Sequence, residues 1–347
     1  MASTRQRRPL SRKLAGFWLS VLALAIPTYF IFWPRPPAAE PLERTEFMMD
    51  TLVTITYFHP AHLPAVEAAL AAMRGVELRM SAHLETSEVS AINRAAGIHP
   101  VRVSLDTLAT IRLGLEVGRL TGGAFDITIK PLMDLWGIGR RGDQLPSPQA
   151  VEEKRRLVDY RRVRVDEARR EVMLEQAGMA LDLGGIAKGH AVDTAARVLS
   201  EHGVTGALIN AGGDIFALGQ RARGRAWRIA VQHPRRSADF IAILELRNIA
   251  IVTSGDYQRF IDVEGRRYHH ILDPRTGAPS RGLVSATTVA NSAAVADAWS
   301  TALFVLGPER GLELVRQVAG LEGLVVTPEG GVSYTPGLRG KVQVMPW

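Results

Sequence analysis

An uncharged run of twenty residues, 14–33, constrains this chain more than any other feature of its sequence. As a helix rising about 1.5 Å per residue, the run would span roughly the 30 Å hydrocarbon core of a bilayer. Five basic residues and no acidic residue precede it. The positive-inside rule therefore predicts a cytoplasmic N-terminus, an anchor in the inner (cytoplasmic) membrane and an extracytoplasmic, periplasmic body.

A cleaved signal peptide is the alternative for residues 1–33, because a basic segment followed by an apolar one is common to both. The run exceeds the usual apolar core of a signal peptide, and residues 34–40 contain no clear A-x-A cleavage site. We therefore predict three parts. A basic tip with a membrane anchor or signal segment covers 1–33, a proline-rich tether covers 34–45, and a folded body covers 46–347.

Charge and composition limit the classes of function. The chain of 347 residues has no cysteine, which excludes disulfides, thiolate metal sites and cysteine nucleophiles. Its net charge is +7, but five of the 42 basic residues precede the apolar run, leaving 37 basic against 35 acidic residues. Because the body carries no basic stripe, we expect no nucleic-acid partner.

Hydrophobic periodicity predicts a body that mixes short strands with helices. One strand is expected over 47–58, and further short strands over 163–165, 171–174, 207–209, 227–231, 241–246, 249–252 and 284–290. Helices are expected over 64–79, 105–120, 186–201, 293–306 and 309–318. The regular strand-helix alternation of a doubly wound sheet is missing, so the predicted class is α+β.

The densest group of reactive side chains is His269-His270-Ile271-Leu272-Asp273-Pro274-Arg275-Thr276-Gly277. On the helix predicted after it, Asp297 and Thr301 lie four residues apart and share one face, with Ser300 adjacent. A carboxylate with a hydroxyl suits magnesium, which completes its shell with water and substrate phosphates. The alternative is a solvated helix edge, and spacing alone does not separate the two.

Several glycine motifs admit a functional and a plain structural interpretation. Asp182-Leu183-Gly184-Gly185-Ile186-Ala187-Lys188-Gly189 lies where a strand meets a helix, and its backbone N–H groups and Lys188 could hold an anion. The alternative is a tight turn closed by a surface lysine. Likewise, residues 210–214 form either a hairpin turn or a ligand loop. Phe125 and Asp126 either contact a planar ligand or belong to the core.

Taken in order, the motifs resemble the FAD:protein FMN transferase family, also called ApbE. They are Met49-Asp50-Thr51, Gly123-Ala124-Phe125-Asp126, 182–189, Asn210-Ala211-Gly212-Gly213-Asp214, Thr253-Ser254-Gly255-Asp256-Tyr257, 269–277 and 297–301. The resemblance covers the chain from residue 46 onward. It implies ApbE-like mixed sheets with packed helices, and an exported, Mg²⁺-dependent enzyme. Such an enzyme splits FAD, attaches FMN by a phosphoester to Ser or Thr of another protein, and releases AMP.

The resemblance also assigns roles to single residues. It implies FAD contacts at Met49, Ala124, Phe125, Asp126, Asp182, Lys188 and Leu272, and at His83, which replaces the family's common tyrosine. It implies Mg²⁺ ligands at Gly185, Asp297, Ser300 and Thr301, where Gly185 and Ser300 would use their backbone carbonyls. Two further positions depart from the family: Asp50 and Lys130 both stand where it has glycine.

We expect the target hydroxyl to attack the FMN-side phosphorus of FAD, with catalysis mostly electrostatic. His270 is the candidate catalytic base, because an imidazole titrates near neutral pH. The alternative base is a carboxylate. It is either Asp297, which we also expect in the catalytic site as a metal ligand, or another carboxylate.

Two other functions are alternatives. An FAD pyrophosphatase that yields FMN and AMP would use the same residues. A non-catalytic extracytoplasmic flavin carrier would have a vestigial metal helix, and the retention of Asp297 and Thr301 argues against it. For the transferase, the expected partners are FAD and a target protein with an acceptor Ser or Thr. We expect this target to be a membrane redox subunit, with the enzyme held at the membrane by its N-terminal helix.

Overall fold

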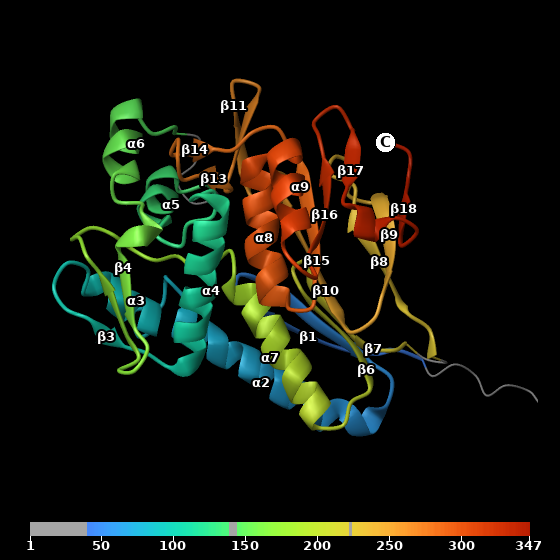
Figure 1. The fold of residues 1–347 in the computed structure, drawn as a ribbon. Helices are drawn as coiled ribbons and strands as arrows, with labels where there is room; N and C mark the ends of the chain where they lie inside the picture. The colour runs from blue at the N-terminus through green and yellow to red at the C-terminus, as the bar shows by residue number, and fades with distance from the viewer. Residues whose placement is uncertain (1–39, 139–143, 222–223) are drawn as a thin grey trace, which may run out of the picture. The chain divides into compact units, whose positions relative to one another are not determined.

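An eight-stranded antiparallel sheet forms the centre of the body (Figure 1). A computed structural model of the chain describes residues 40–138, 144–221 and 224–347. In sheet order the strands are β1 (Leu42–Met48), β2 (Thr51–Tyr57), β6 (Gly206–Ala211), β7 (Asp214–Gly219), β10 (Ile249–Gly255), β15 (Ser285–Ala290), β16 (Glu322–Val326) and β17 (Val332–Tyr334). Every neighbouring pair is antiparallel.

The N-terminal strands differ from the expectation. The single strand predicted over 47–58 is wrong, because the chain reverses at Met49 and Asp50, whose φ angles are 52° and 60°. Two successive positive φ values are typical of a two-residue hairpin turn, which this sequence makes without the usual glycine. The first strand, β1, begins at Leu42, so residues 42–45, assigned above to the tether, pair with β2.

The segment predicted as anchor or signal, 1–33, and residues 34–39 of the tether lie outside the described residues. Within the part of the chain that the structure describes, no helix is long and apolar enough to cross a membrane.

Helices cover one face of the large sheet (Figure 1). They are α2 (Leu63–Met80), α4 (Leu105–Thr121), α7 (Ala187–Glu201), α8 (Ala293–Leu306) and α9 (Pro308–Gln317). The five predicted helices are confirmed, with ends shifted by at most one residue. Met73, Leu199 and Phe304 from three of these helices are fully buried in one apolar core with Ile55 and Val252 of the sheet.

A second, smaller sheet covers part of the opposite face. Its strands are β18 (Val342–Val344), β9 (Phe240–Leu246) and β8 (Trp227–Gln232). Ile229 and Leu244 of this sheet pack with Ile251 and Val289 of the large one in a separate apolar core. Because β15 is covered on both faces, all six of its residues are buried, which confirms the buried strand predicted there.

Shorter elements complete the body. They are α3 (Glu88–Arg94), α5 (Lys130–Trp136), α6 (Pro148–Arg155), the strands β3 (Val101–Arg102), β4 (Val163–Asp166) and β5 (Glu171–Leu174), the hairpins β11 (Phe260–Val263) with β12 (Arg266–His269) and β13 (Leu272–Asp273) with β14 (Ala278–Pro279), and the short 3₁₀ turns η1 (Pro60–His62), η2 (Tyr160–Arg162) and η4 (Pro336–Leu338). The mixture of a large antiparallel sheet with helices packed on one face confirms the α+β class.

Candidate functional site

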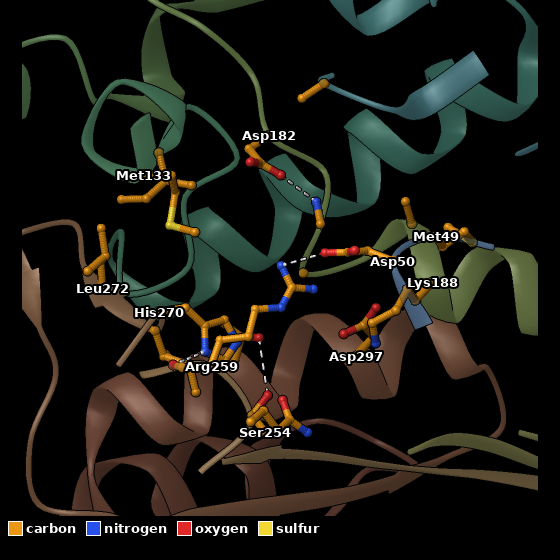
Figure 2. A pocket seen from close by; sticks show the side chains of 18 of the residues that line it. Met49, Asp50, Met133, Asp182, Lys188, Ser254, Arg259, His270, Leu272 and Asp297 are labelled. Atoms are coloured by element: carbon orange, nitrogen blue, oxygen red, sulfur yellow. Dashed lines mark hydrogen bonds and ion pairs between the residues drawn. The ribbon is translucent and has the colours of Figure 1, made fainter. Parts of the chain in front are cut away.

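A cavity of about 570 Å³ opens among the β1–β2 turn, the start of α7, the end of β10, the segment before β13, and α8. This volume lies within the range of about 300–1,000 Å³ that is usual for small-molecule sites. Figure 2 shows side chains from these distant segments around it. The topology thus gathers residues that are up to about 250 positions apart in the sequence.

The cavity collects nearly every residue proposed above for the site. Its lining includes Met49, His83, Ala124, Phe125, Asp126, Asp182, Gly185, Lys188, His270, Leu272, Asp297 and Thr301. Ser300 is the exception: it is fully buried, and its hydroxyl lies 2.8 Å from Ser254 Oγ and donates to the carbonyl of Asp297 at 2.9 Å. The side chain of Ser300 is therefore occupied inside the protein, and the residue does not line the cavity.

The helices α7 and α8 cross closely beside this cavity. A Cβ at Gly189 would lie 2.2 Å from the carbonyl oxygen of Ala293, so only glycine permits the approach. Asp193 of α7 then accepts hydrogen bonds from the Ser292 hydroxyl at 2.6 Å and from the N–H groups of Ala293 and Ala294 at 2.7 and 3.0 Å. This side chain satisfies N–H groups in the first turn of α8, which fixes the helix that carries Asp297.

A buried cluster of charges lies where the two helices meet the sheet. Lys188 Nζ is 2.7 Å from Asp214 Oδ1, and Asp297 Oδ2 accepts the N–H of Gly189 at 3.1 Å. Burial and the neighbouring Asp214 raise the pKa of Asp297 well above its usual value. Burial acts to lower the pKa of Lys188, but Asp214 and Asp297 outweigh it and raise that pKa. The lysine is therefore charged.

The same cluster fits a hard cation. Asp297 and Thr301 offer a carboxylate and a hydroxyl, and a Cβ at Gly185 would lie 3.5 Å from Thr301 Oγ1, so this glycine faces the same space. Asp214 Oδ2 is buried and has no hydrogen-bond partner. Among the described residues no group of three or more His, Cys, Asp or Glu side chains forms a metal centre. A donor set of one or two carboxylates with other oxygens suits Mg²⁺ rather than Zn²⁺.

The two histidines of the 269–277 motif have different environments. His269 is buried: its Nε2 lies 2.9 Å from the Ser280 carbonyl, and its Nδ1 accepts from the N–H of Ile271 at 3.3 Å, so it holds the backbone. His270 lines the cavity, with its Nδ1 3.3 Å from the Arg259 carbonyl. Because a carbonyl only accepts, Nδ1 carries the proton and Nε2 keeps a free lone pair. Burial, followed by the charge of Arg259, lowers the pKa of His270 to about 3.

The remainder of the motif is a rigid turn beside the cavity. The Asp273 carboxylate binds the Arg275 guanidinium through two hydrogen bonds of 2.9 and 2.8 Å, and Trp136 Nε1 donates to the Gly277 carbonyl at 2.7 Å. These contacts fasten the turn to α5 and place Leu272 in the wall of the cavity.

Asp126 and Phe125 have structural contacts as well as a place at the cavity. The Asp126 carboxylate accepts from the N–H and hydroxyl of Thr128 at 2.8 and 2.6 Å, and from the N–H of Tyr160 at 2.9 Å. Burial nevertheless raises its pKa to about 6. Phe125 is only 5% exposed and packs under Gly185. Both residues therefore shape the wall, and little of the Phe125 ring remains for a planar ligand.

The glycine motif at 210–214 has both of the roles considered for it. Gly212 and Gly213 adopt φ angles of 61° and 102° in the β6–β7 hairpin turn, where Asn210 Oδ1 accepts the N–H of Gly213 at 2.9 Å. The last residue of the motif, Asp214, lies beside Lys188 in the cavity. The hairpin turn thus places the carboxylate of Asp214 in the site.

Arg259, Glu77 and Met133 are among the lining residues that were not found from the sequence. Glu77 Oε1 accepts the N–H of Met49 at 2.7 Å and so holds the β1–β2 turn against α2. Arg259 follows the 253–257 motif by two positions, and that proximity was the available signal. Glu77 and Met133 lie inside helices, and nothing in the sequence pattern distinguishes them from their neighbours.

The model of the ApbE family matches residues 49–325. An FAD:protein FMN transferase of Treponema pallidum is 33% identical over 321 residues, covering 87% of this chain and 89% of that protein. Another, from Klebsiella pneumoniae, is 37% identical over 243 residues, covering 70% and 75%.

Solved structures agree with this match. The ApbE protein of Thermotoga maritima has a TM-score of 0.81 at 34% identity and covers 87% of this chain and 99% of that chain. The flavin transferase ApbE from Vibrio cholerae has a TM-score of 0.79 at 29% identity, with coverages of 88% and 100%. With the family match spanning most of the body, this chain belongs to the ApbE family.

Proposed function

We infer that this chain is an FAD:protein FMN transferase, an enzyme that transfers the FMN part of FAD to a target protein. Relatives with this name align with most of the chain. The observation that carries the inference is the cavity itself. It brings a charged Lys188, the oxygen ligands of Asp297 and Thr301, and an imidazole with a free Nε2 to one place.

For the reaction, we propose that a Ser or Thr hydroxyl of the target attacks the FMN-side phosphorus of FAD. A new P–O bond forms, the P–O bond to the AMP part breaks, and AMP leaves with the electron pair. The hydroxyl proton passes to Nε2 of His270. Lys188 counters negative charge on the transferred phosphate, since positioning and charge stabilisation dominate this class of reaction.

The residues that would hold Mg²⁺ are Asp297 and Thr301 through their side chains, and Gly185 and Ser300 through their carbonyls. When bound, the ion supplies charge neutralisation on the diphosphate. Asp297, whose ionised form is costly in the buried site, gains a cation partner there, which favours its charged state.

Without a bound substrate, His270 is a weak base, because its pKa is about 3. A bound diphosphate places negative charge beside the ring, and this favours the protonated imidazole and raises its pKa. The residue therefore gains basicity when the substrate is present, which suits a general base. The competing base is a carboxylate of the same cluster, Asp297 or Asp214.

The proposed target is a flavin-bearing subunit of a membrane electron-transfer complex. The apolar run at 14–33 and the basic residues before it support a body held at the extracytoplasmic face of the inner membrane. An anchored transferase in the periplasm would meet such a target on the same membrane.

The test is to incubate the full-length protein with FAD, Mg²⁺ and a candidate membrane redox subunit, and to measure the subunit's mass and the nucleotide products. Transfer produces a subunit carrying covalent FMN, together with AMP. Free FMN and AMP with no modified subunit, across several targets, would instead indicate an FAD pyrophosphatase. Unchanged FAD would indicate a flavin carrier.

Asp297→Ala should abolish both products, because it removes the carboxylate at the metal site. The matched control is Asp262→Ala, which removes an exposed carboxylate that pairs with Arg267 outside the cavity. The control should keep the activity of the unchanged protein. Full activity in Asp297→Ala would refute the assignment of this residue.

A further inference from the structure

An ion pair joins two segments across the cavity. Arg259, just before β11, directs its guanidinium to Asp50 in the β1–β2 turn, with 3.4 Å between Nη1 and Oδ2. Both residues line the cavity. Figure 2 shows the guanidinium between His270 on one side and Lys188 and Asp297 on the other. Arg259 therefore reaches into the space where the phosphates of a bound dinucleotide would meet the catalytic groups.

The charge of the cavity wall makes this arginine important. Among the described residues that line the cavity there are seven aspartate and glutamate side chains, against the two permanent cations Lys188 and Arg259. A diphosphate that enters so acidic a wall needs positive partners. A bound divalent ion offsets part of the repulsion, and the two side-chain cations must supply the remainder.

The two cations differ in how freely they can change partner. Lys188 is 2.7 Å from Asp214, which is 2% exposed, and moving the lysine away would leave a buried carboxylate uncompensated. The side chains of Arg259 and Asp50 are 48% and 64% exposed, and their separation is longer. Exposed pairs of this kind stabilise a protein by at most about 1 kcal/mol. The arginine can thus leave its carboxylate at little cost.

A phosphate is the better partner for this guanidinium. Its planar N–H groups match the oxygens of a phosphate and form short, charge-assisted hydrogen bonds. The backbone of Arg259 also has a fixed relation to the candidate base, since its carbonyl accepts from the backbone N–H of His270 at 3.1 Å and lies 3.3 Å from its Nδ1. A phosphate held by the side chain would therefore be held in register with His270.

We propose that Arg259 binds the diphosphate of FAD, and that Asp50 is the counter-ion which the arginine exchanges for phosphate when FAD enters. Asp50 therefore weakens FAD binding by competing for Arg259. This inference rests on the proposed function, because it takes FAD as the ligand of the cavity.

The test is a double-mutant cycle read by equilibrium binding to the full-length protein without any acceptor. Asp50→Asn removes the charge and suits the left-handed backbone at this position, which asparagine tolerates. Arg259→Gln removes the cation. Titration calorimetry with FAD, with ADP, which carries a diphosphate and adenosine but no flavin, and with riboflavin, which carries the flavin but no phosphate, separates the two parts of the ligand.

Asp50→Asn should tighten FAD and ADP binding by about three- to five-fold, the range of an exposed ion pair. Arg259→Gln should weaken both by about ten-fold or more, as expected for lost charge-assisted hydrogen bonds. In the Arg259→Gln background, Asp50→Asn should not change the affinity for FAD or ADP, because there is no longer an arginine for which Asp50 and the phosphate compete. Riboflavin affinity should be the same in all four proteins. The control Asp262→Asn, which frees Arg267 outside the cavity, should change nothing.

Two results would overturn the inference. One is an unchanged affinity for FAD and ADP in Arg259→Gln. The other is a gain from Asp50→Asn that persists without Arg259, which would mean that Asp50 repels the ligand directly. Equal FAD affinities in all variants would refute this inference but not the proposed function. If the unchanged protein does not bind FAD, both are refuted.

Discussion

The crossing of α7 and α8 at Gly189 determines where Asp297 lies, and a single added methyl group tests this. In Gly189→Ala the new Cβ would lie 2.2 Å from the carbonyl oxygen of Ala293, 2.5 Å from its carbon and 2.7 Å from Cα of Ala294. Comfortable contacts between such atoms are about 3.5–4.0 Å. All three neighbours are backbone atoms, so the methyl group is accommodated only if the helices separate by roughly 1 Å.

The cost follows from two opposing effects. Overpacking of a core typically costs about 1–3 kcal/mol, and rigid backbone neighbours place this site at the upper end. Alanine recovers up to about 1 kcal/mol over glycine through its helix propensity. The net expectation is a loss of about 2 kcal/mol in the free energy of unfolding. The shift would also lengthen the 3.1 Å bond from the Gly189 N–H to Asp297. A displacement of about 1 Å at a reacting centre can cost roughly a hundred-fold in rate.

Gly75→Ala is the matched control, because it makes the same substitution inside α2. Its Cβ would meet only Arg79 Nη1, at 3.3 Å, the far end of a flexible side chain. Here the helix propensity of alanine should dominate and stabilise the protein by about 0.5–1 kcal/mol. The two variants should therefore change stability in opposite directions. Denaturant unfolding of both, followed by FMN transfer assays under saturating Mg²⁺, measures the two effects.

If Gly189→Ala unfolds at the same denaturant concentration as the unchanged protein and transfers FMN at the same rate, the close crossing of α7 and α8 does not determine where Asp297 lies. Loss of stability with full activity would refute only the link between the helix crossing and the position of Asp297.

Two other predictions concern stability. The folded-state pKa of His270 is depressed to about 3 from an ordinary 6.5, so its contribution to stability is complete above pH 6.5 and is lost as the pH falls toward 3. Between pH 8 and pH 5 the free energy of unfolding should fall by about 2 kcal/mol at most, because the cavity gives the ring some solvent. In urea unfolding, His270→Gln should remove this part of the pH dependence. An identical pH dependence in that variant would contradict the neutral, buried imidazole. Asp193→Ala removes three hydrogen bonds at the start of α8 and should lower the free energy of unfolding by about 1–3 kcal/mol. Asp193→Asn keeps one acceptor oxygen and should lower it less. Equal stability of the two variants and the unchanged protein would show that these hydrogen bonds are dispensable.

The helices were predictable because their information is local. The apolar period that places Met73, Leu199 and Phe304 in the core is visible within about eighteen residues of sequence. The β1–β2 hairpin was missed because Met49 and Asp50 take left-handed backbone angles without the glycine that usually marks them. Here the pairing of Leu42–Met48 with Thr51–Tyr57, and the hydrogen bond that the Met49 N–H donates to Glu77, outweigh the local backbone preference.

The candidate site divides in the same way. Asp297 and Thr301 share a helix face, so their proximity follows from a spacing of four residues. Their neighbours do not follow from that spacing: Asp214 comes from a hairpin turn and Lys188 from another helix. Burial, together with the neighbouring Asp214, raises the pKa of Asp297. Similarly, nothing near Ser300 in the sequence shows that Ser254 occupies its hydroxyl.

The sequence alone therefore determined the α+β class, the main helices, the family resemblance and a set of residues that line the cavity. These depend on local periodicity and on the order of motifs. Only the tertiary structure decided which groups are paired: Lys188 with Asp214, Arg259 with Asp50, and the Nδ1 of His270 with a backbone carbonyl. The physical reason is that charge, tautomer and available partner depend on distance and burial, and these arise only when segments far apart in the chain pack together.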